Sequence, residues 1–127
     1  LDLVAITGVQ LKMINELCTV YEIPFKQSLA RPIVISLIGS LGAAMLAPMI
    51  ATTTIKFIPG IGSLLAGTAL AATSAGITYA EGHLYLDHFK NGGNLENLNL
   101  IKGRRIFKCK VKEGMQQEAE VKAETTA

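Results

Sequence analysis

The chain has 127 residues, a length typical of one domain, and a formal net charge of +2 at pH 7. Half of the residues are hydrophobic, only 17% are charged, and the mean hydropathy is +0.38. Because soluble domains carry about 25% charged residues, this composition argues against an ordinary soluble domain.

Residues 3–22 are predicted to form an amphipathic helix that ends before Pro24. At 100° per residue, a set of apolar side chains shares one face, with Gln10 as the one polar residue among them. The face is made by Leu3, Ile6, Val9, Met13, Leu17 and Val20. Because the opposite face is not strongly basic, we favour docking of this helix on a neighbouring element. The alternative is a helix that lies on a membrane surface.

Two runs of residues, 32–55 and 57–80, contain no Asp, Glu, Lys or Arg. A helix needs about 20 apolar residues to cross a bilayer, so the runs predict a two-helix transmembrane hairpin over residues 32–80, with a kink at Pro48. The alternatives are a buried helix pair in a soluble domain and a re-entrant hairpin. Basic residues flank both runs and Lys56 alone lies between them, so the positive-inside rule places both termini in the cytoplasm.

The sequence between the runs, IKFIPGIGSLLAG (residues 55–67), raises the question of a phosphate-binding loop. Gly62 and Gly67 have P-loop spacing, but Thr68 stands where the motif requires lysine. The dinucleotide-binding fingerprint fails because Leu65 takes the place of its third glycine. A turn between helices fits better, because proline disfavours helix and glycine adopts positive φ. The predicted turn residues are Lys56, Pro59, Gly60 and Gly62.

Small residues recur at every fourth position in both uncharged runs. This spacing places them on one stripe of a helix, so that two backbones can approach closely and pack in a membrane. We therefore predict that the two helices pack face to face, or against copies of the chain in a homo-oligomer. The predicted packing residues are Gly39, Ala43, Ala47, Gly67, Ala71 and Ala75.

The segment YAEGHLYLDHFKNGG (residues 79–93) extends the second helix until the Asn-Gly-Gly sequence ends it. Its acidic and histidine side chains invite a metal site. Glu81 and His88 share one helix face, whereas His83 and Asp87 lie on nearly the opposite face. Four ligands split in this way cannot close a tetrahedral site. We predict no catalytic, metal-binding or cofactor-binding residue, and hence no enzyme.

Residues 102–112, KGRRIFKCKVK, form a basic stretch in which Phe107, Cys109 and Val111 alternate with lysines, as in a strand. Basic residues beside a membrane segment attract anionic lipid headgroups by about 1 kcal/mol per charge. Nucleic acid is disfavoured, because no stacking platform or reading motif accompanies the charges. The polar residues that follow are predicted to be unstructured. The predicted lipid-headgroup residues are Arg104, Arg105, Lys108, Lys110 and Lys112.

Three segments together resemble the bacterial YcjF-like family, a domain of unknown function. They are AITGVQLKMINELCTVYEIPF, the apolar hairpin with FIPGIG, and TYAEGHLYLDHFKNGGNLENL. The resemblance covers residues 4–100 and implies an inner-membrane or membrane-associated domain, often attached to or encoded beside an Era-type P-loop GTPase. It implies no catalytic residues. Because this chain has no GTPase domain, such a partner would act in trans.

We therefore predict an all-α membrane-hairpin domain over residues 1–101 and an irregular basic and acidic tail over residues 102–127. Cys18 and Cys109 are expected to be reduced thiols that face the cytosol. The predicted function is a non-enzymatic scaffold or adaptor of the bacterial inner or intracytoplasmic membrane. It would self-associate and present cytoplasmic surfaces to a partner such as a P-loop GTPase or a larger membrane assembly. The alternative is an oligomeric pore or transport component, although no intramembrane acid or arginine marks an ion path.

Overall fold

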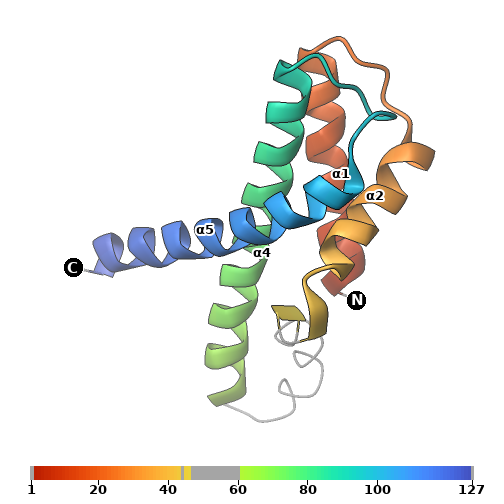
Figure 1. Cartoon of the computed structure of the whole chain (residues 1–127). Helices are drawn as coiled ribbons and strands as arrows, with labels where there is room; N and C mark the ends of the chain where they lie inside the picture. Colours follow the sequence, from red (N-terminus) through yellow and green to blue (C-terminus); the bar gives the residue numbers. More distant parts are fainter. Residues whose placement is uncertain (1, 44, 47–60, 127) are drawn as a thin grey trace.

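The computed structural model describes residues 2–43, 45–46 and 61–126. Four helices account for most of this part of the chain (Figure 1): α1 (Asp2–Val20), α2 (Gln27–Gly39), α4 (Ile61–Lys90) and α5 (Leu100–Thr126). No strand occurs among the described residues. The predicted all-α class is therefore confirmed.

The helices α1 and α4 lie side by side and run in the same direction. Gln10 donates a hydrogen bond to Thr78 Oγ1 at 2.9 Å. Further along, the rings of Tyr21 and Phe89 have centroids 6.0 Å apart. Both pairs are separated by 68 residues in sequence, and a constant offset of this kind is the signature of parallel neighbours. Because α1 also packs on α2, the prediction that it docks on neighbouring elements is confirmed.

The face of α1 that packs on these neighbours differs from the predicted one. Gln10 is fully buried, whereas Val4, Val9 and Val20 are 75%, 55% and 74% exposed. The buried stripe continues through Leu11, Ile14 and Cys18. Because α1 contacts two helices at once, its buried face follows the space between α2 and α4 and not the most apolar direction of the helix alone.

The helix α5 crosses α4 near the middle of α4 (Figure 1), and two glycines make the crossing close. A Cβ added to Gly114 would lie 3.0 Å from the Gly76 Cα and 2.7 Å from the Tyr79 Cβ. A Cβ added to Gly76 would lie 2.7 Å from the carbonyl oxygen of Val111. Only residues without a Cβ allow two helix backbones to approach this closely.

The prediction of a strand-like basic stretch and an irregular tail is wrong, because residues 100–126 form the single helix α5. Phe107 and Val111 are fully buried while Cys109 is exposed. Residues 107 and 111 are two strand repeats apart and also about one helical turn apart, so the alternation fits both periods. The predicted domain boundary at residue 101 falls inside α5.

The first uncharged run does not form one continuous helix. The helix α2 begins before it, includes Pro32, and ends at Gly39. Gly42 follows with a φ of +82°, which is left-handed backbone. Gly62 was predicted to lie in the turn, but it lies in the first turn of α4. That correction has a simple reason: a glycine costs a helix only about 1 kcal/mol. Five of the predicted residues lie outside the described residues: Ala47, Pro48, Lys56, Pro59 and Gly60.

The described residues do not show a two-helix transmembrane hairpin. Among them, one helical stretch is long and apolar enough to cross a membrane, and it is Leu3–Val20 of α1, with a mean hydropathy of 1.3. About a third of this stretch, 33%, is buried inside the molecule. Since core helices of soluble proteins pass the same test, the stretch is weak evidence for a membrane span.

Candidate membrane interface and adjoining pocket

Basic side chains of α5 gather on one side of the helix. Arg104, Lys108 and Lys112 follow one another at every fourth position, and this spacing places them on one line along α5. Arg105 borders the line, and all four side chains are exposed. These four residues, Arg104, Arg105, Lys108 and Lys112, are called the basic stripe below.

The basic stripe lies beside the C-terminal end of α2 and the residues that follow it. The guanidinium of Arg104 donates a hydrogen bond to Ser36 Oγ at 2.7 Å. Lys108 and Lys112 line a shallow pocket of about 280 Å³ together with Leu41 and Met45. The positive charges of α5 therefore adjoin apolar side chains from the first uncharged run.

Lys110, which was predicted to bind lipid with the others, is separated from the basic stripe. Its side chain is half-buried, and its Nζ lies 3.6 Å from a carboxylate oxygen of Glu113. Glu113 also accepts a hydrogen bond from the Tyr79 hydroxyl at 3.1 Å. The helical period turns residue 110 away from residues 108 and 112, and a neighbouring carboxylate balances its charge.

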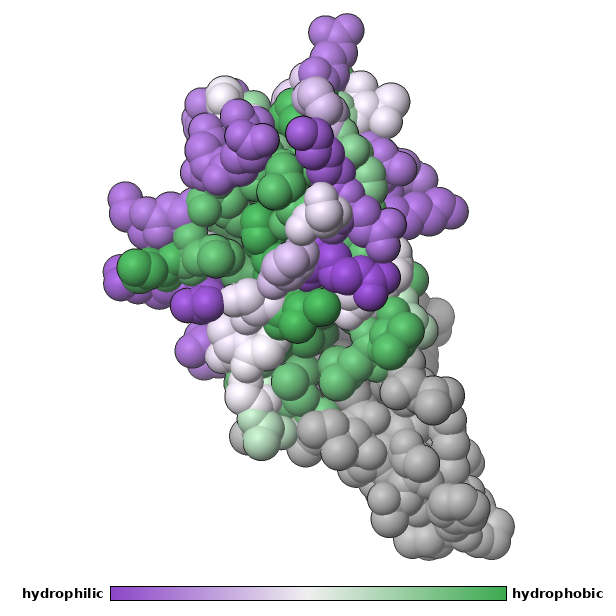
Figure 2. All heavy atoms as spheres, turned by 90° about the vertical axis from the view of Figure 1, so that its right-hand side faces the viewer, coloured by the Kyte–Doolittle hydropathy of each residue, from purple (hydrophilic) through white to green (hydrophobic). Residues whose placement is uncertain are grey.

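The molecule has a polar part and an apolar part. Hydrophilic side chains gather in the upper part of Figure 2, and the described side chains toward the lower part are mostly hydrophobic. In Figure 1, the start of α1, the end of α2 and the first half of α4 all lie below α5. The basic stripe thus lies at the border between the polar part and the apolar part.

The predicted packing residues lie mostly on the surface of the chain. Gly39, Ala43 and Ala71 are exposed, Ala75 is half-buried, and Gly67 lies in α4. A Cβ added to Gly39 would meet nothing within 4 Å. The close helix contact within the chain is made instead by Gly76 and Gly114. Packing between copies of the chain therefore stays a prediction.

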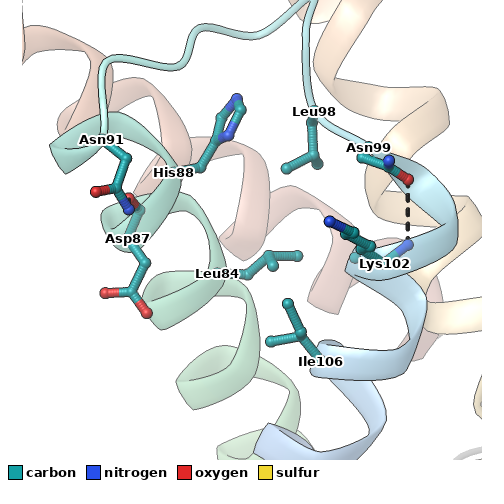
Figure 3. Close-up of a pocket in the computed structure, with 9 residues that line it drawn as sticks. Leu84, Asp87, His88, Asn91, Leu98, Asn99, Lys102 and Ile106 are labelled. Atoms are coloured by element: carbon teal, nitrogen blue, oxygen red, sulfur yellow. Dashed lines mark hydrogen bonds between the residues drawn. The ribbon is translucent and has the colours of Figure 1, made fainter.

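A pocket of about 220 Å³ lies between the end of α4 and the start of α5 (Figure 3). Leu84, Leu98 and Ile106 supply its apolar lining. Lys102 projects from α5 into the space between the helices, while the carboxylate of Asp87 points away from it. The pocket opens in the polar part of the molecule and holds aliphatic groups next to one cation.

The loop that closes this pocket is held by specific caps. The N–H of Gly93 donates to the His88 carbonyl at 2.8 Å and the N–H of Gly92 to the Phe89 carbonyl at 3.0 Å. With the positive φ of Gly92, +86°, this is a Schellman cap. His88 Nε2 lies 2.7 Å from the Asn94 carbonyl oxygen. The Asn-Gly-Gly sequence therefore ends α4 as predicted, and His88 supports the loop.

The acidic and histidine side chains near the end of α4 do not converge on one point where they could share a ligand. Within the described residues, no group of three or more His, Cys, Asp or Glu side chains is arranged to hold a metal ion. His83 packs against the Tyr79 ring, with centroids 4.2 Å apart. Glu81 lies in the core and Asp87 at the surface. These side chains therefore lie in different surroundings on α4.

Glu81 is a buried ionisable residue whose burial the sequence analysis did not predict. Its side chain is fully buried, and neither carboxylate oxygen has a hydrogen-bond partner. Burial raises the pKa of Glu81 from 4.5 to about 8. Burial also raises the pKa of Tyr85, with smaller contributions from the charges of Glu81 and Cys18. Helical spacing could have predicted this burial, because Glu81 lies on the same helix face as the apolar residues Ile77, Ala80, Leu84 and Tyr85.

Comparison with known proteins gives one relative. The chain is 34% identical over 129 aligned residues to Magnetosome membrane protein 22 of Magnetospirillum gryphiswaldense, and the alignment covers 99% of this chain. It covers 65% of the relative, so the chain spans just under two thirds of that protein. No protein-family model matches the chain, which leaves the YcjF-like resemblance without support, and no solved structure matches it. The chain is thus similar to a bacterial membrane protein of the magnetosome.

Proposed function

We propose that the protein is a non-enzymatic scaffold or adaptor associated with a bacterial inner or intracytoplasmic membrane. The observation that carries the proposal is the position of the basic stripe, which borders the apolar part of the molecule. The likeness to a magnetosome membrane protein supports the membrane location. The non-enzymatic role rests on the lack of a complete catalytic set in the sequence.

The basic stripe matches the headgroup layer of a bilayer. If the apolar part below α5 enters the hydrocarbon core, α5 lies at the level of the lipid phosphates. Four exposed cations near an anionic surface contribute about 4 kcal/mol, at about 1 kcal/mol each. The anchor then includes the portions of the two uncharged runs that lie below α5, and the end of α5 stays on the cytoplasmic side, while the start of α1 lies at the level of the anchor.

Self-association completes the scaffold proposal. Gly67, Ala71 and Ala75 form a stripe of small residues on α4, and Ala71 is exposed. Close packing of this stripe against its copy would bring two α4 backbones together. The polar part would then present its surfaces, including the pocket of Lys102, to a partner such as a P-loop GTPase or a larger membrane assembly.

The position of α5 can be tested by fluorescence quenching. Cys109 is exposed on α5 and Cys18 is buried, so a fluorophore on Cys109 reports the distance of α5 from the membrane surface. The labelled protein is reconstituted in vesicles that contain phosphatidylglycerol and a quencher attached to lipid headgroups. We expect strong quenching that weakens at about 1 M salt, where the screening length is about 3 Å.

A matched pair of variants makes this test specific. Replacing the four residues of the basic stripe with Gln removes four charges and should abolish the salt dependence of the quenching, because the apolar anchor still holds α5 near the membrane. The control removes four charges elsewhere, at Lys12, Lys26, Lys90 and Lys102, and should keep the salt dependence. Equal salt dependence of the quenching in the two variants would show that the basic stripe does not lie on the headgroups.

Self-association can be tested by native mass spectrometry in mild detergent. Ala71→Leu should lower the number of chains per particle, because a larger side chain separates the two helices. Ala119→Leu, at an exposed position of α5, is the control and should leave the mass unchanged. If Ala71→Leu also leaves it unchanged, the α4 stripe is not an oligomer contact.

A further inference from the structure

An apolar groove of about 290 Å³ runs between α1 and α2. Leu3 and Val4 line it from α1, and Ile35 and Ile38 line it from α2. Val4 is 75% exposed and Ile35 is 52% exposed. These side chains leave apolar surface open to the surroundings, in the part of the molecule that borders the proposed membrane face.

One end of this groove carries a positive charge. Arg31, Ile35 and Gly39 all line the groove, and their spacing of four residues places them in a row along α2. Eight residues of helix separate Arg31 from Gly39, which is about 12 Å along the helix axis. No ion pair joins the exposed Arg31 side chain to a described residue. The groove is therefore cationic at one end and apolar along its length.

We propose that this groove binds one acyl chain of an anionic phospholipid, whose phosphate group pairs with Arg31. A guanidinium donates paired hydrogen bonds to phosphate oxygens, and the apolar walls match a hydrocarbon chain. Arg31 lies toward the polar part of the molecule, and Gly39 and Leu46 lie toward the apolar part. A bound lipid would thus point in the same direction as the lipids of the proposed membrane, so the inference rests on the proposed function.

The lining favours a lipid over a second copy of the chain. The closest approach of two helices in a membrane uses small residues along the contact, but Val4, Ile35 and Leu46 are bulky and line most of the groove. Thr7 and Gly39 are the small residues of its lining, and a Cβ on Gly39 would meet nothing within 4 Å. A flexible acyl chain can follow such a surface, whereas a rigid helix cannot.

The proposal can be tested by counting the lipids that stay bound to the full chain. The protein is purified in mild detergent, mixed with phosphatidylglycerol or phosphatidylcholine, and measured by native mass spectrometry. Gly39→Leu fills the groove and should remove both lipids. Arg31→Gln keeps the groove open and should lower the binding of phosphatidylglycerol about tenfold, with little effect on phosphatidylcholine.

Gly8→Leu is the matched control, because a Cβ at Gly8 also meets nothing within 4 Å. It should bind both lipids like the unchanged protein. The proposal is overturned if Gly39→Leu binds lipid as well as Gly8→Leu does. It is equally overturned if Gly39→Leu changes the number of chains per particle and not the number of lipids, because a second copy then occupies the groove.

The quenching of a fluorophore on Cys109 separates this proposal from the proposed function. Neither Gly39→Leu nor Arg31→Gln touches the basic stripe, so both variants should keep the headgroup quenching. If both keep it and Gly39→Leu still retains lipid in the groove, the groove proposal alone fails. If the unchanged protein shows no quenching, the membrane placement of α5 fails.

Discussion

Gly114 of α5 lies directly against Gly76 of α4, so closely that a Cβ on Gly114 would lie 3.0 Å from the Gly76 Cα. The same Cβ would lie 2.7 Å from the Cβ of Tyr79. Both neighbouring atoms are rigid, because one belongs to the backbone and the other is the first atom of a side chain. This contact fixes where α5 crosses α4, and with it the position of the basic stripe.

We therefore expect Gly114→Ala to lower the free energy of unfolding by about 1–3 kcal/mol, as overpacking of a tight contact does. Thermal unfolding followed by far-UV circular dichroism in mild detergent measures the change. Gly103→Ala is the control on the same helix, because its Cβ would meet Leu37 and Leu84 at 3.9 Å, an ordinary contact. It should raise stability by up to about 1 kcal/mol. Equal effects of the two variants would contradict a tight crossing at Gly114.

Several elements of the fold can be predicted from local sequence patterns. The helix at residues 3–22 matches α1, and the Asn-Gly-Gly stop matches the end of α4 at Lys90. These features depend on apolar periodicity and on capping chemistry, which are local properties of the chain. The helix α5 was missed because Phe107 and Val111 fit a strand period as well as a helix period. Its polar continuation also gave no apolar pattern.

The candidate membrane interface depends on tertiary contacts more strongly than the individual helices do, so less of it could be predicted from the sequence. The sequence identified the basic residues, but only the helical form of α5 separates Lys110 from the basic stripe. Likewise, Gly76 and Gly114 look like any other glycines until two helices are known to cross there. The sequence analysis weighed Glu81 only as a candidate metal ligand, and its burial is decided by the helices that pack on α4. Which faces meet is decided by the whole packing and not by one segment.

The buried carboxyl of Glu81 makes stability depend on pH. Burial raises its pKa from 4.5 to about 8, so the folded state keeps a proton that the unfolded state releases. Below about pH 4.5 both states hold the proton and the stability is highest. Between about pH 4.5 and 8 the free energy of unfolding should fall by up to about 1.4 kcal/mol per pH unit.

Glu81→Gln should remove this dependence, because an amide of the same shape does not titrate. Denaturant unfolding at a series of pH values compares the slopes of the two proteins. Glu16→Gln, at an exposed position of α1, is the control and should keep the slope of the unchanged protein. A slope that survives in Glu81→Gln would mean that another group titrates.

The end of α1 holds a non-glycine residue in left-handed backbone. Glu22 has a φ of +56°, and Ile23 N–H donates to the Cys18 carbonyl at 2.8 Å, as in a Schellman cap. Left-handed backbone costs a residue with a Cβ about 1–2 kcal/mol. Glu22→Gly should therefore stabilise the protein by about 1 kcal/mol in thermal unfolding. Glu16→Gly, inside the same helix, should destabilise it by a similar amount, and the opposite signs make the test decisive.

Asn99 determines where α5 begins. Its Oδ1 accepts hydrogen bonds from the N–H groups of Ile101 at 3.0 Å and Lys102 at 3.2 Å. These two donors have no partner inside the helix, because the first four N–H groups of a helix never do. We expect Asn99→Ala to lower the free energy of unfolding by about 1 kcal/mol.

Asn99→Asp keeps the acceptor and adds a negative charge at the helix N-terminus, so it should retain or raise the stability of the unchanged protein. Asn97→Ala is not a suitable control, because the Asn97 side chain accepts a hydrogen bond from the Asn94 N–H at 2.7 Å. Gln116→Ala, at an exposed position of α5, removes an amide without removing a cap and should be nearly neutral. If Asn99→Ala is as stable as Gln116→Ala, the start of α5 does not depend on this cap.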